Sequence, residues 1–332
     1  TLDCGPLTKH CPLLTVTEHY PLRLPTVTAY CLSLIQYLHR YRYGLSTVVC
    51  GLIQNSSLLT LKSFKMPTIT TNGINIYFEE KGSGEPLLLI MGITAPGIVW
   101  EKHVAHWAKS FRCILVDNRG VGKSDKPAGP YTSLQMAQDC IGVLDHLGLG
   151  AVKVAGVSMG SIIAQQMAIH FPTRVKAMVL MCPWARCDNA AKAIFQHMKD
   201  CKARLKPEEF SVYIQLLIFS KPSWDNEEFH AGLLEDRKNA ALDPNPQPLI
   251  GLEGQAAACV AHDVLEDLAK VNCPVFVLGG EEDIFTPVWM TKEVAAAIPG
   301  SVLHVYEKSG HAFHWENLED FNERVGDWLK KQ

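Results

Sequence analysis

The chain has 332 residues, 47% of them hydrophobic and 20% charged, which suffices for one large or two modest folded domains and excludes a largely disordered chain. Its 31 Lys and Arg against 34 Asp and Glu give a net charge of −3, without the basic surplus of a dedicated nucleic-acid-binding protein. No apolar run reaches the roughly 18 residues of a membrane span. The eleven cysteines form no CxxC pair, so no metal cluster is expected, and the cytoplasm is the simplest compartment.

Residues 1–65 differ in composition from the rest of the chain. They hold two of the 34 acidic residues, six basic residues and no methionine, and a regular pattern of elements begins only after Met66. We therefore predict an N-terminal extension, 1–65, that is not part of the fold. The competing interpretation is a targeting segment, because the stretch is basic, poor in acids and partly amphipathic.

From Met66 onward, short apolar runs alternate with helical patterns, as a parallel sheet with helices on both faces requires. The first two runs flank Asn72-Gly73, a dipeptide that predicts an antiparallel hairpin. The expected strands are 68–71, 74–80, 87–91, 113–116, 152–155, 177–181, 275–278 and 302–305. The sequence thus predicts an α/β fold with an eight-stranded, mostly parallel sheet.

The stretch 183–262 interrupts this alternation, because it contains helical patterns and no strand candidate. Ligands of open α/β sheets bind at the carboxyl ends of the strands, so we expect an all-helical cap over that edge. The expected helices are 189–203, 207–219, 226–241 and 248–261. The fold would then consist of a first core part (66–182), the cap (183–262) and a second core part (263–332).

The sharpest chemical signal is the pentapeptide Gly156-Val157-Ser158-Met159-Gly160, which follows an apolar run and opens a helical pattern. In this strand–turn–helix context, G-x-S-x-G presents a serine on a sharp turn at the rim of the sheet and at a helix N-terminus. Glycines flank the serine because side chains at those positions would clash with the neighbouring strand and helix. We therefore predict that Ser158 is a nucleophile rather than a serine that stands between two glycines by chance.

A serine nucleophile needs a base and an acid that orients the base. His311 follows the last predicted strand on a glycine turn, and the adjacent Glu281, Glu282 and Asp283 follow the strand before it. The order serine, acid, histidine is the one expected for this nucleophile turn. His314 is a weaker candidate for the base.

Acyl transfer also needs two hydrogen-bond donors for the developing oxyanion. The backbone N–H of Met159 is one candidate, and the N–H of Ile93, in the turn after the strand 87–91, is the other. Large aromatic side chains are expected to line an apolar pocket, although such residues at helical spacing are also common in an ordinary core. The pocket candidates are Trp100, Trp184 and Tyr213.

The chain from Met66 onward resembles an α/β-hydrolase-fold protein of the serine esterase and lactonase kind, with a helical cap. Residues 117–124 are similar to the family's structural D-x-R-G-x-G-x-S turn, 279–287 to its acid-bearing loop and 309–311 to its histidine loop. This resemblance implies that the acid is Asp283.

The resemblance also limits the chemistry. Dehalogenases and epoxide hydrolases of the family carry an aspartate where this chain has Ser158, so neither activity is expected. Many members have His-Gly at the oxyanion turn, whereas this chain has Met91-Gly92. The donor at this turn is a backbone N–H, so the departure leaves it in place. Catalysis without a metal or other cofactor is implied.

The expected function is hydrolysis, through an acyl-enzyme, of a small-molecule carboxylic ester or lactone with a substantially apolar acyl or alcohol part. With the same triad, hydrolysis of a carbon–carbon bond or cofactor-free perhydrolysis is an alternative. A ligand receptor built on a hydrolase fold, with little turnover, is a further one. Neither a nucleic acid nor a membrane span is expected, and the oligomeric state is not indicated.

Overall fold

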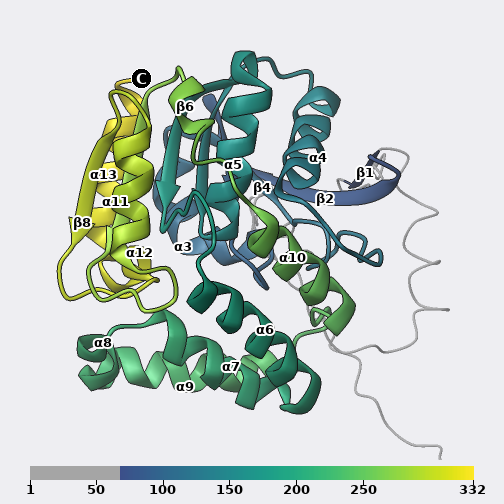
Figure 1. The fold of residues 1–332 in the computed structure, drawn as a ribbon, viewed down its shortest axis with the longest axis vertical. Coiled ribbons are helices and arrows are strands. Elements are labelled where there is room, and N and C mark those ends of the chain that lie inside the picture. Colours follow the sequence, from purple (N-terminus) through teal and green to yellow (C-terminus); the bar gives the residue numbers. More distant parts are fainter. Residues whose placement is uncertain (1–67) are drawn as a thin grey trace, which may run out of the picture. The chain divides into compact units, whose positions relative to one another are not determined.

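Eight strands form one sheet in the order β1-β2-β4-β3-β5-β6-β7-β8 in the computed structural model, which describes residues 68–332 (Figure 1). β2 pairs antiparallel with β1 and β4, and every other pair is parallel. The strands are β1 (Thr68–Thr71), β2 (Ile74–Lys81), β3 (Glu85–Ile90), β4 (Phe111–Val116), β5 (Val152–Val157), β6 (Val175–Met181), β7 (Val275–Gly280) and β8 (Val302–Tyr306). The predicted eight-stranded, mostly parallel sheet is confirmed. The predicted extension 1–65 lies outside the described residues.

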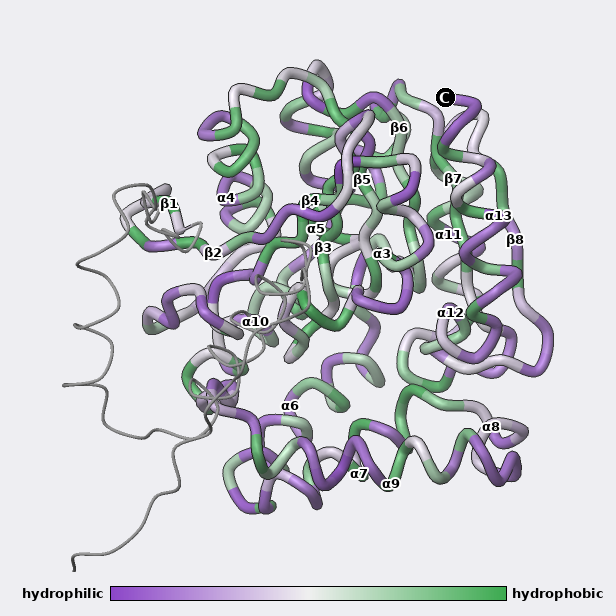
Figure 2. Tube along the Cα trace, turned by 180° about the vertical axis from the view of Figure 1, so that it is seen from behind, coloured by the Kyte–Doolittle hydropathy of each residue, from purple (hydrophilic) through white to green (hydrophobic). Residues whose placement is uncertain are grey.

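Alternate residues of the strands enter two separate hydrophobic cores. Leu88 and Ile90 of β3 pack with α4, α5 and α11, whereas Leu87 and Leu89 pack with α3 and α13. All four side chains are completely buried, so the sheet is covered on both faces, and Figure 2 shows the hydrophobic residues concentrated along the central strands. The covering helices are α3 (Glu101–Trp107), α4 (Ser133–His146), α5 (Met159–His170), α11 (Val288–Ala297) and α13 (Leu318–Lys330).

The insertion between β6 and β7 is helical, as the sequence predicts. Helices α6 to α9 form a separate layer, and α10 returns from it to the core (Figure 1). A single bridge between Arg186 and Asp263 joins the two ends of the insertion. The helices are α6 (Asn189–Arg204), α7 (Pro207–Ile218), α8 (Lys221–Asp225), α9 (Glu227–Ala241) and α10 (Leu249–Ala261).

The remaining helices are short and lie in connections. They are η1 (Gly97–Trp100), η2 (Pro172–Arg174), η3 (Leu268–Lys270) and α12 (Phe313–Glu316). Of the helices between residues 68 and 332, none combines the length and the hydrophobicity that a bilayer crossing requires.

Candidate active site

Ser158 stands on the turn between β5 and α5 in a strained conformation. Its φ of 54° and ψ of −119° lie outside the regions that non-glycine residues normally occupy. A Cβ at Gly156 would lie 2.2 Å from the Gly160 carbonyl oxygen, and a Cβ at Gly160 would lie 2.0 Å from that of Ile90. Both positions therefore require glycine, for the steric reason predicted from the sequence. Backbone strain of this kind concentrates at functional sites.

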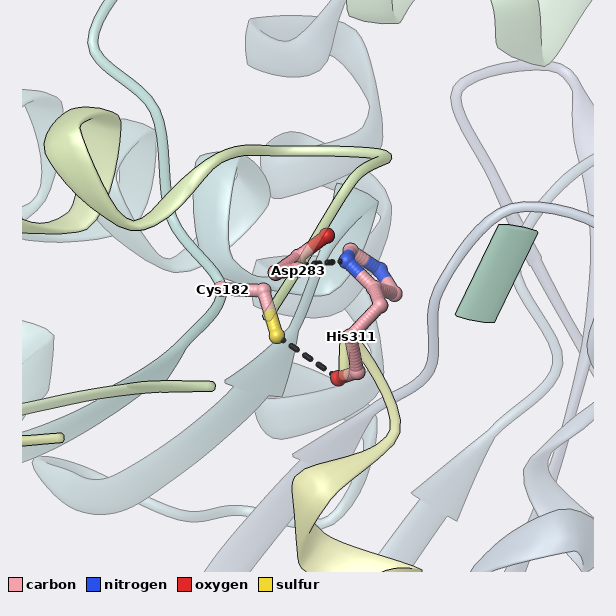
Figure 3. Close-up of side chains that lie close together, drawn as sticks. All are labelled: Cys182, Asp283 and His311. Atoms are coloured by element: carbon pink, nitrogen blue, oxygen red, sulfur yellow. Dashed lines mark hydrogen bonds and ion pairs between the residues drawn. The ribbon is translucent and has the colours of Figure 1, made fainter. Parts of the chain in front are cut away.

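His311 and Asp283 form a buried pair at the carboxyl ends of neighbouring strands (Figure 3). His311 Nδ1 lies 2.7 Å from Asp283 Oδ2, and Oδ1 of the same carboxylate accepts hydrogen bonds from the N–H groups of Phe285 and Thr286 at 2.8 and 2.9 Å. The Thr286 hydroxyl oxygen lies 3.0 Å from both Asp283 Oδ2 and His311 Nδ1. A carboxylate at Nδ1 holds the neutral imidazole with its proton on that nitrogen, so Nε2 is the ring nitrogen that can accept a proton.

Burial separates Asp283 from the two carboxylates beside it. The side chains of Glu281 and Glu282 are exposed, whereas Asp283 is buried against the histidine. Of the three candidates, the structure thus brings only Asp283 to His311.

Ser158 and His311 border one cavity of about 140 Å³. The Ser158 hydroxyl oxygen is buried and makes no hydrogen bond with any residue of the described part of the chain, His311 included. The structure therefore brings the three predicted residues to one site. His311 is hydrogen-bonded to Asp283, whereas Ser158 is not hydrogen-bonded to His311. Hydrogen bonds between catalytic residues are often long in the absence of substrate and shorten when substrate binds.

The two residues predicted to supply the oxyanion donors lie near the serine in the fold or in the chain. Gly92 approaches it so closely that a Cβ on Gly92 would lie 3.3 Å from Ser158 Cβ, and the next residue, Ile93, borders the cavity. Met159 opens α5, where the first N–H groups have no partner within the helix. Ile93 therefore borders the cavity and Met159 directly follows the serine, and their role as oxyanion donors stays a prediction.

A buried glutamine holds the turn that carries Ile93. Thr94 has a φ of 72°, which is unusual for a β-branched residue. Its N–H donates to Gln255 Oε1 at 3.0 Å, and Gln255 Nε2 donates to the Arg119 carbonyl oxygen at 2.8 Å. The local sequence gives no signal for this role of Gln255, because Gln255 lies 161 residues from Thr94 on an apolar helix.

We expect Gln255→Leu to lower kcat on an activated ester by up to about 10²-fold, because the Ile93 donor loses its support. The same change leaves the Thr94 N–H without a partner, at a cost of about 1–3 kcal/mol in the free energy of unfolding. Steady-state kinetics and thermal melting measure the two effects. Gln196→Leu, an exposed position on α6, is the matched control. Unchanged kcat in Gln255→Leu would show that the turn does not depend on this glutamine.

The three aromatic residues predicted to line the pocket do not border the cavity. Trp100 is completely buried in the core beside α3, Trp184 packs against Phe195, and Tyr213 packs against Phe210. That prediction is corrected, because helical spacing marks an apolar face without saying whether the face meets a cavity or the core.

Other apolar side chains, both aliphatic and aromatic, border the cavity instead. The cap contributes side chains from α6 and α7, and the segments at the carboxyl ends of β3, β5, β7 and β8 form the rest of the wall. The main apolar side chains at the cavity are Met198, Ile214, Ile218, Phe285 and Trp315. The cavity thus lies between the cap and the carboxyl ends of the strands, as the insertion predicts.

The cap and the histidine loop are joined by hydrogen bonds. Glu316 accepts from the Ser220 N–H and from the Gly310 N–H, each at 2.7 Å. The Ala312 N–H donates to the Ile218 carbonyl oxygen at 2.8 Å. The residues on both sides of the histidine are therefore tied to the cap segment that walls the cavity.

Cys182 also lies beside the histidine–aspartate pair, and potential ligand atoms of the three side chains lie within 4.8 Å of one another (Figure 3). Its Sγ donates to the His311 carbonyl oxygen at 2.9 Å, and burial raises the pKa of the thiol well above its ordinary value. Metals bind the thiolate, so this protonated thiol suits a hydrogen bond better than a metal site.

Several known proteins are similar to this chain in sequence and fold. The α/β-hydrolase-fold family matches over residues 85–208. A relative named carbamate hydrolase RutD, from Azorhizobium caulinodans, is 28% identical over 78% of this chain and 97% of its own length. A second relative, named non-heme bromoperoxidase BpoC, from Mycobacterium tuberculosis, is 28% identical over 75% of this chain and 95% of its own length. A third relative, 3-oxoadipate enol-lactonase 2 from Acinetobacter baylyi, is 28% identical over 80% of this chain and 96% of its own length.

A solved structure extends the comparison to an esterase. The thermophilic esterase from Thermogutta terrifontis superposes with a TM-score of 0.70 at 27% identity, over 80% of this chain and 97% of the esterase. The described part of the chain thus has the α/β-hydrolase fold, and the chain is similar in sequence to proteins with that fold.

Proposed function

We propose that this protein is a serine hydrolase that cleaves a small carboxylic ester or lactone through Ser158, His311 and Asp283. The observation that carries the proposal is the buried His311–Asp283 pair at 2.7 Å, which shares a cavity with a serine on a strained strand–helix turn.

In the proposed reaction, Ser158 Oγ attacks the carbonyl carbon of the substrate while His311 Nε2 takes the serine proton. Asp283 stabilises the imidazolium, and the N–H groups of Ile93 and Met159 stabilise the negative charge on the carbonyl oxygen. His311 then gives the proton to the leaving alkoxide, which departs as the alcohol. Water, activated by the same base, attacks the acyl-enzyme and releases the acid.

The lining of the cavity supports a substrate with an apolar part next to the carbonyl. Met198 and Ile218 of the cap face the same space as Ser158, and apolar walls bind apolar groups. The esterase and the enol-lactonase with which the chain compares act, by their names, on the proposed class of bond.

Perhydrolysis is the second candidate, favoured by the similarity to the bromoperoxidase. In that reaction hydrogen peroxide replaces water on the acyl-enzyme, so a peracid forms in place of the acid. The triad and the oxyanion donors are the same, and the two reactions differ only in the second nucleophile.

A substrate panel tests the proposal. The purified protein is assayed with p-nitrophenyl acetate and butyrate, with γ- and δ-lactones, and with a carboxylic acid plus hydrogen peroxide and bromide. We expect ester or lactone hydrolysis that disappears in Ser158→Ala. Bromination that outpaces hydrolysis would favour perhydrolysis, and ligand binding without turnover would favour a receptor. Cleavage of a 1,3-diketone in preference to esters would favour carbon–carbon hydrolysis.

A further inference from the structure

His314 borders the same cavity as Ser158 but has no part in the proposed triad. It belongs to a row of three buried side chains from α12, α3 and α13. His314 Nδ1 lies 3.0 Å from His103 Nε2, and His103 Nδ1 lies 2.7 Å from Asn322 Oδ1. Their exposed fractions are 2%, 0% and 5% respectively, so the row is closed off from bulk water.

The hydrogen bonds of this row fix the proton positions. Asn322 Oδ1 can only accept, so His103 carries its proton on Nδ1. Burial lowers the pKa of His103 to about 4 and that of His314 well below its ordinary value, so both rings are neutral at pH 7. The unprotonated Nε2 of His103 then accepts from His314 Nδ1. The proton of His314 is therefore on Nδ1, and its Nε2 holds a lone pair.

This Nε2 atom has no partner in the described part of the chain. It makes no hydrogen bond there. It is also absent from the set of fully buried polar atoms without a partner, so it keeps some accessible surface. Because His314 borders the cavity, we infer that Nε2 faces the cavity space. An acceptor in a mostly apolar space binds best to a ligand that brings a donor.

We propose that His314 Nε2 determines specificity by accepting a hydrogen bond from a hydroxyl or amide N–H group of the substrate, next to the scissile carbonyl. The proposal rests on the proposed function, because it takes Ser158 as the nucleophile in the same cavity. His314 transfers no proton in this account. It selects ester or lactone substrates that carry a donor over substrates of the same shape without one.

Two pairs of p-nitrophenyl esters test this selectivity. The 3-hydroxybutyrate and 3-methylbutyrate esters exchange a hydroxyl for a methyl group, and the N-acetylglycine and 4-oxopentanoate esters exchange an N–H for a methylene. We expect kcat/KM to favour the donor ester of at least one pair by about tenfold, the scale of one neutral hydrogen bond. The pair that shows the preference identifies the kind of donor.

The preference should fall to near one in His314→Phe, which removes the acceptor. It should also fall in His103→Phe, because the proton of His314 is then no longer held on Nδ1, although His103 is not part of the cavity wall. The ratio within a pair is the readout, since partial misfolding lowers both members alike. An exposed histidine on the cap, His197, supplies the control His197→Phe, which should keep the preference.

Two results would overturn the proposal. One is Ser158-dependent cleavage with no preference in either pair, and the other is a preference that survives in His314→Phe. If no ester is cleaved at all, the proposed function fails instead. The acceptor is then tested by calorimetric binding of the matching N,N-dimethylamides. Equal affinities within both pairs would refute it, and tighter binding of a donor member that is lost in His314→Phe would support it.

Discussion

Replacement of Ser158 by alanine is expected to lower kcat on an activated ester by at least about 10⁴-fold, because no acyl-enzyme can form without the nucleophile. The measurement is the rate of p-nitrophenol release at saturating ester, corrected for the uncatalysed reaction. Ser161→Ala is the matched control. It removes a buried hydroxyl that bonds to the Ser158 carbonyl oxygen, one turn along the same helix, and it leaves the nucleophile in place.

A triad acts as one unit, so the loss should not grow when a second member is removed. His311→Ala is expected to be as damaging as Ser158→Ala, and the double variant should be no slower than either single variant. Near-full activity in Ser158→Ala would contradict the serine-hydrolase account, whichever substrate is used.

Replacement of Asp283 by asparagine is expected to lower kcat by about 10⁴-fold, because the amide no longer holds the imidazole in the required tautomer. Glu281→Gln and Glu282→Gln should each change kcat by no more than a few-fold, because both residues are exposed and the carboxylate bonded to the histidine is that of Asp283. The comparison uses the same ester and the same background correction. The assignment would be wrong if Glu282→Gln proved to be the inactive variant while Asp283→Asn kept its rate.

The order of the strands and helices was predictable because buried parallel strands appear in the sequence as apolar runs. The exact strand ends were not, because polar residues at the ends do not belong to the apolar run. β3 begins at Glu85 and β4 at Phe111, each two residues before the predicted start, since Glu85 and Arg112 at these ends are polar. Helix α8 has five residues, too few to show a helical period, and was not predicted.

In the candidate site, the residues that follow from local sequence were predictable. Ser158 is marked by flanking glycines that contact the neighbouring backbone, and His311 follows from its place after a strand. The strand before it indicates three adjacent carboxylates, of which the family resemblance singles out Asp283. Supporting residues such as Gln255 and His103 could not be predicted from the sequence. Their partners lie 161 and 211 residues away, and only tertiary packing brings them together.

The pocket wall was mispredicted for a related reason. Trp184, in the loop before α6, and Tyr213, on α7, have the size of pocket residues, yet the sequence does not say whether each side chain meets the core or the cavity. The structure places the shorter Ile214 and Ile218 at the cavity instead. The shape of the cavity depends on the position of the cap relative to the core. In this protein, hydrogen bonds to Glu316 and to the Ile218 carbonyl group join the cap to the histidine loop.

The most direct test of the central claim is covalent labelling with a fluorophosphonate probe, followed by peptide mass spectrometry. The account predicts one adduct, on the peptide that contains Ser158, and its absence from both Ser158→Ala and heat-denatured protein. Labelling of Ser161→Ala should proceed as in the unaltered chain. An adduct on another residue, or no adduct on a folded protein that still cleaves esters, would contradict the assignment of Ser158 as the nucleophile.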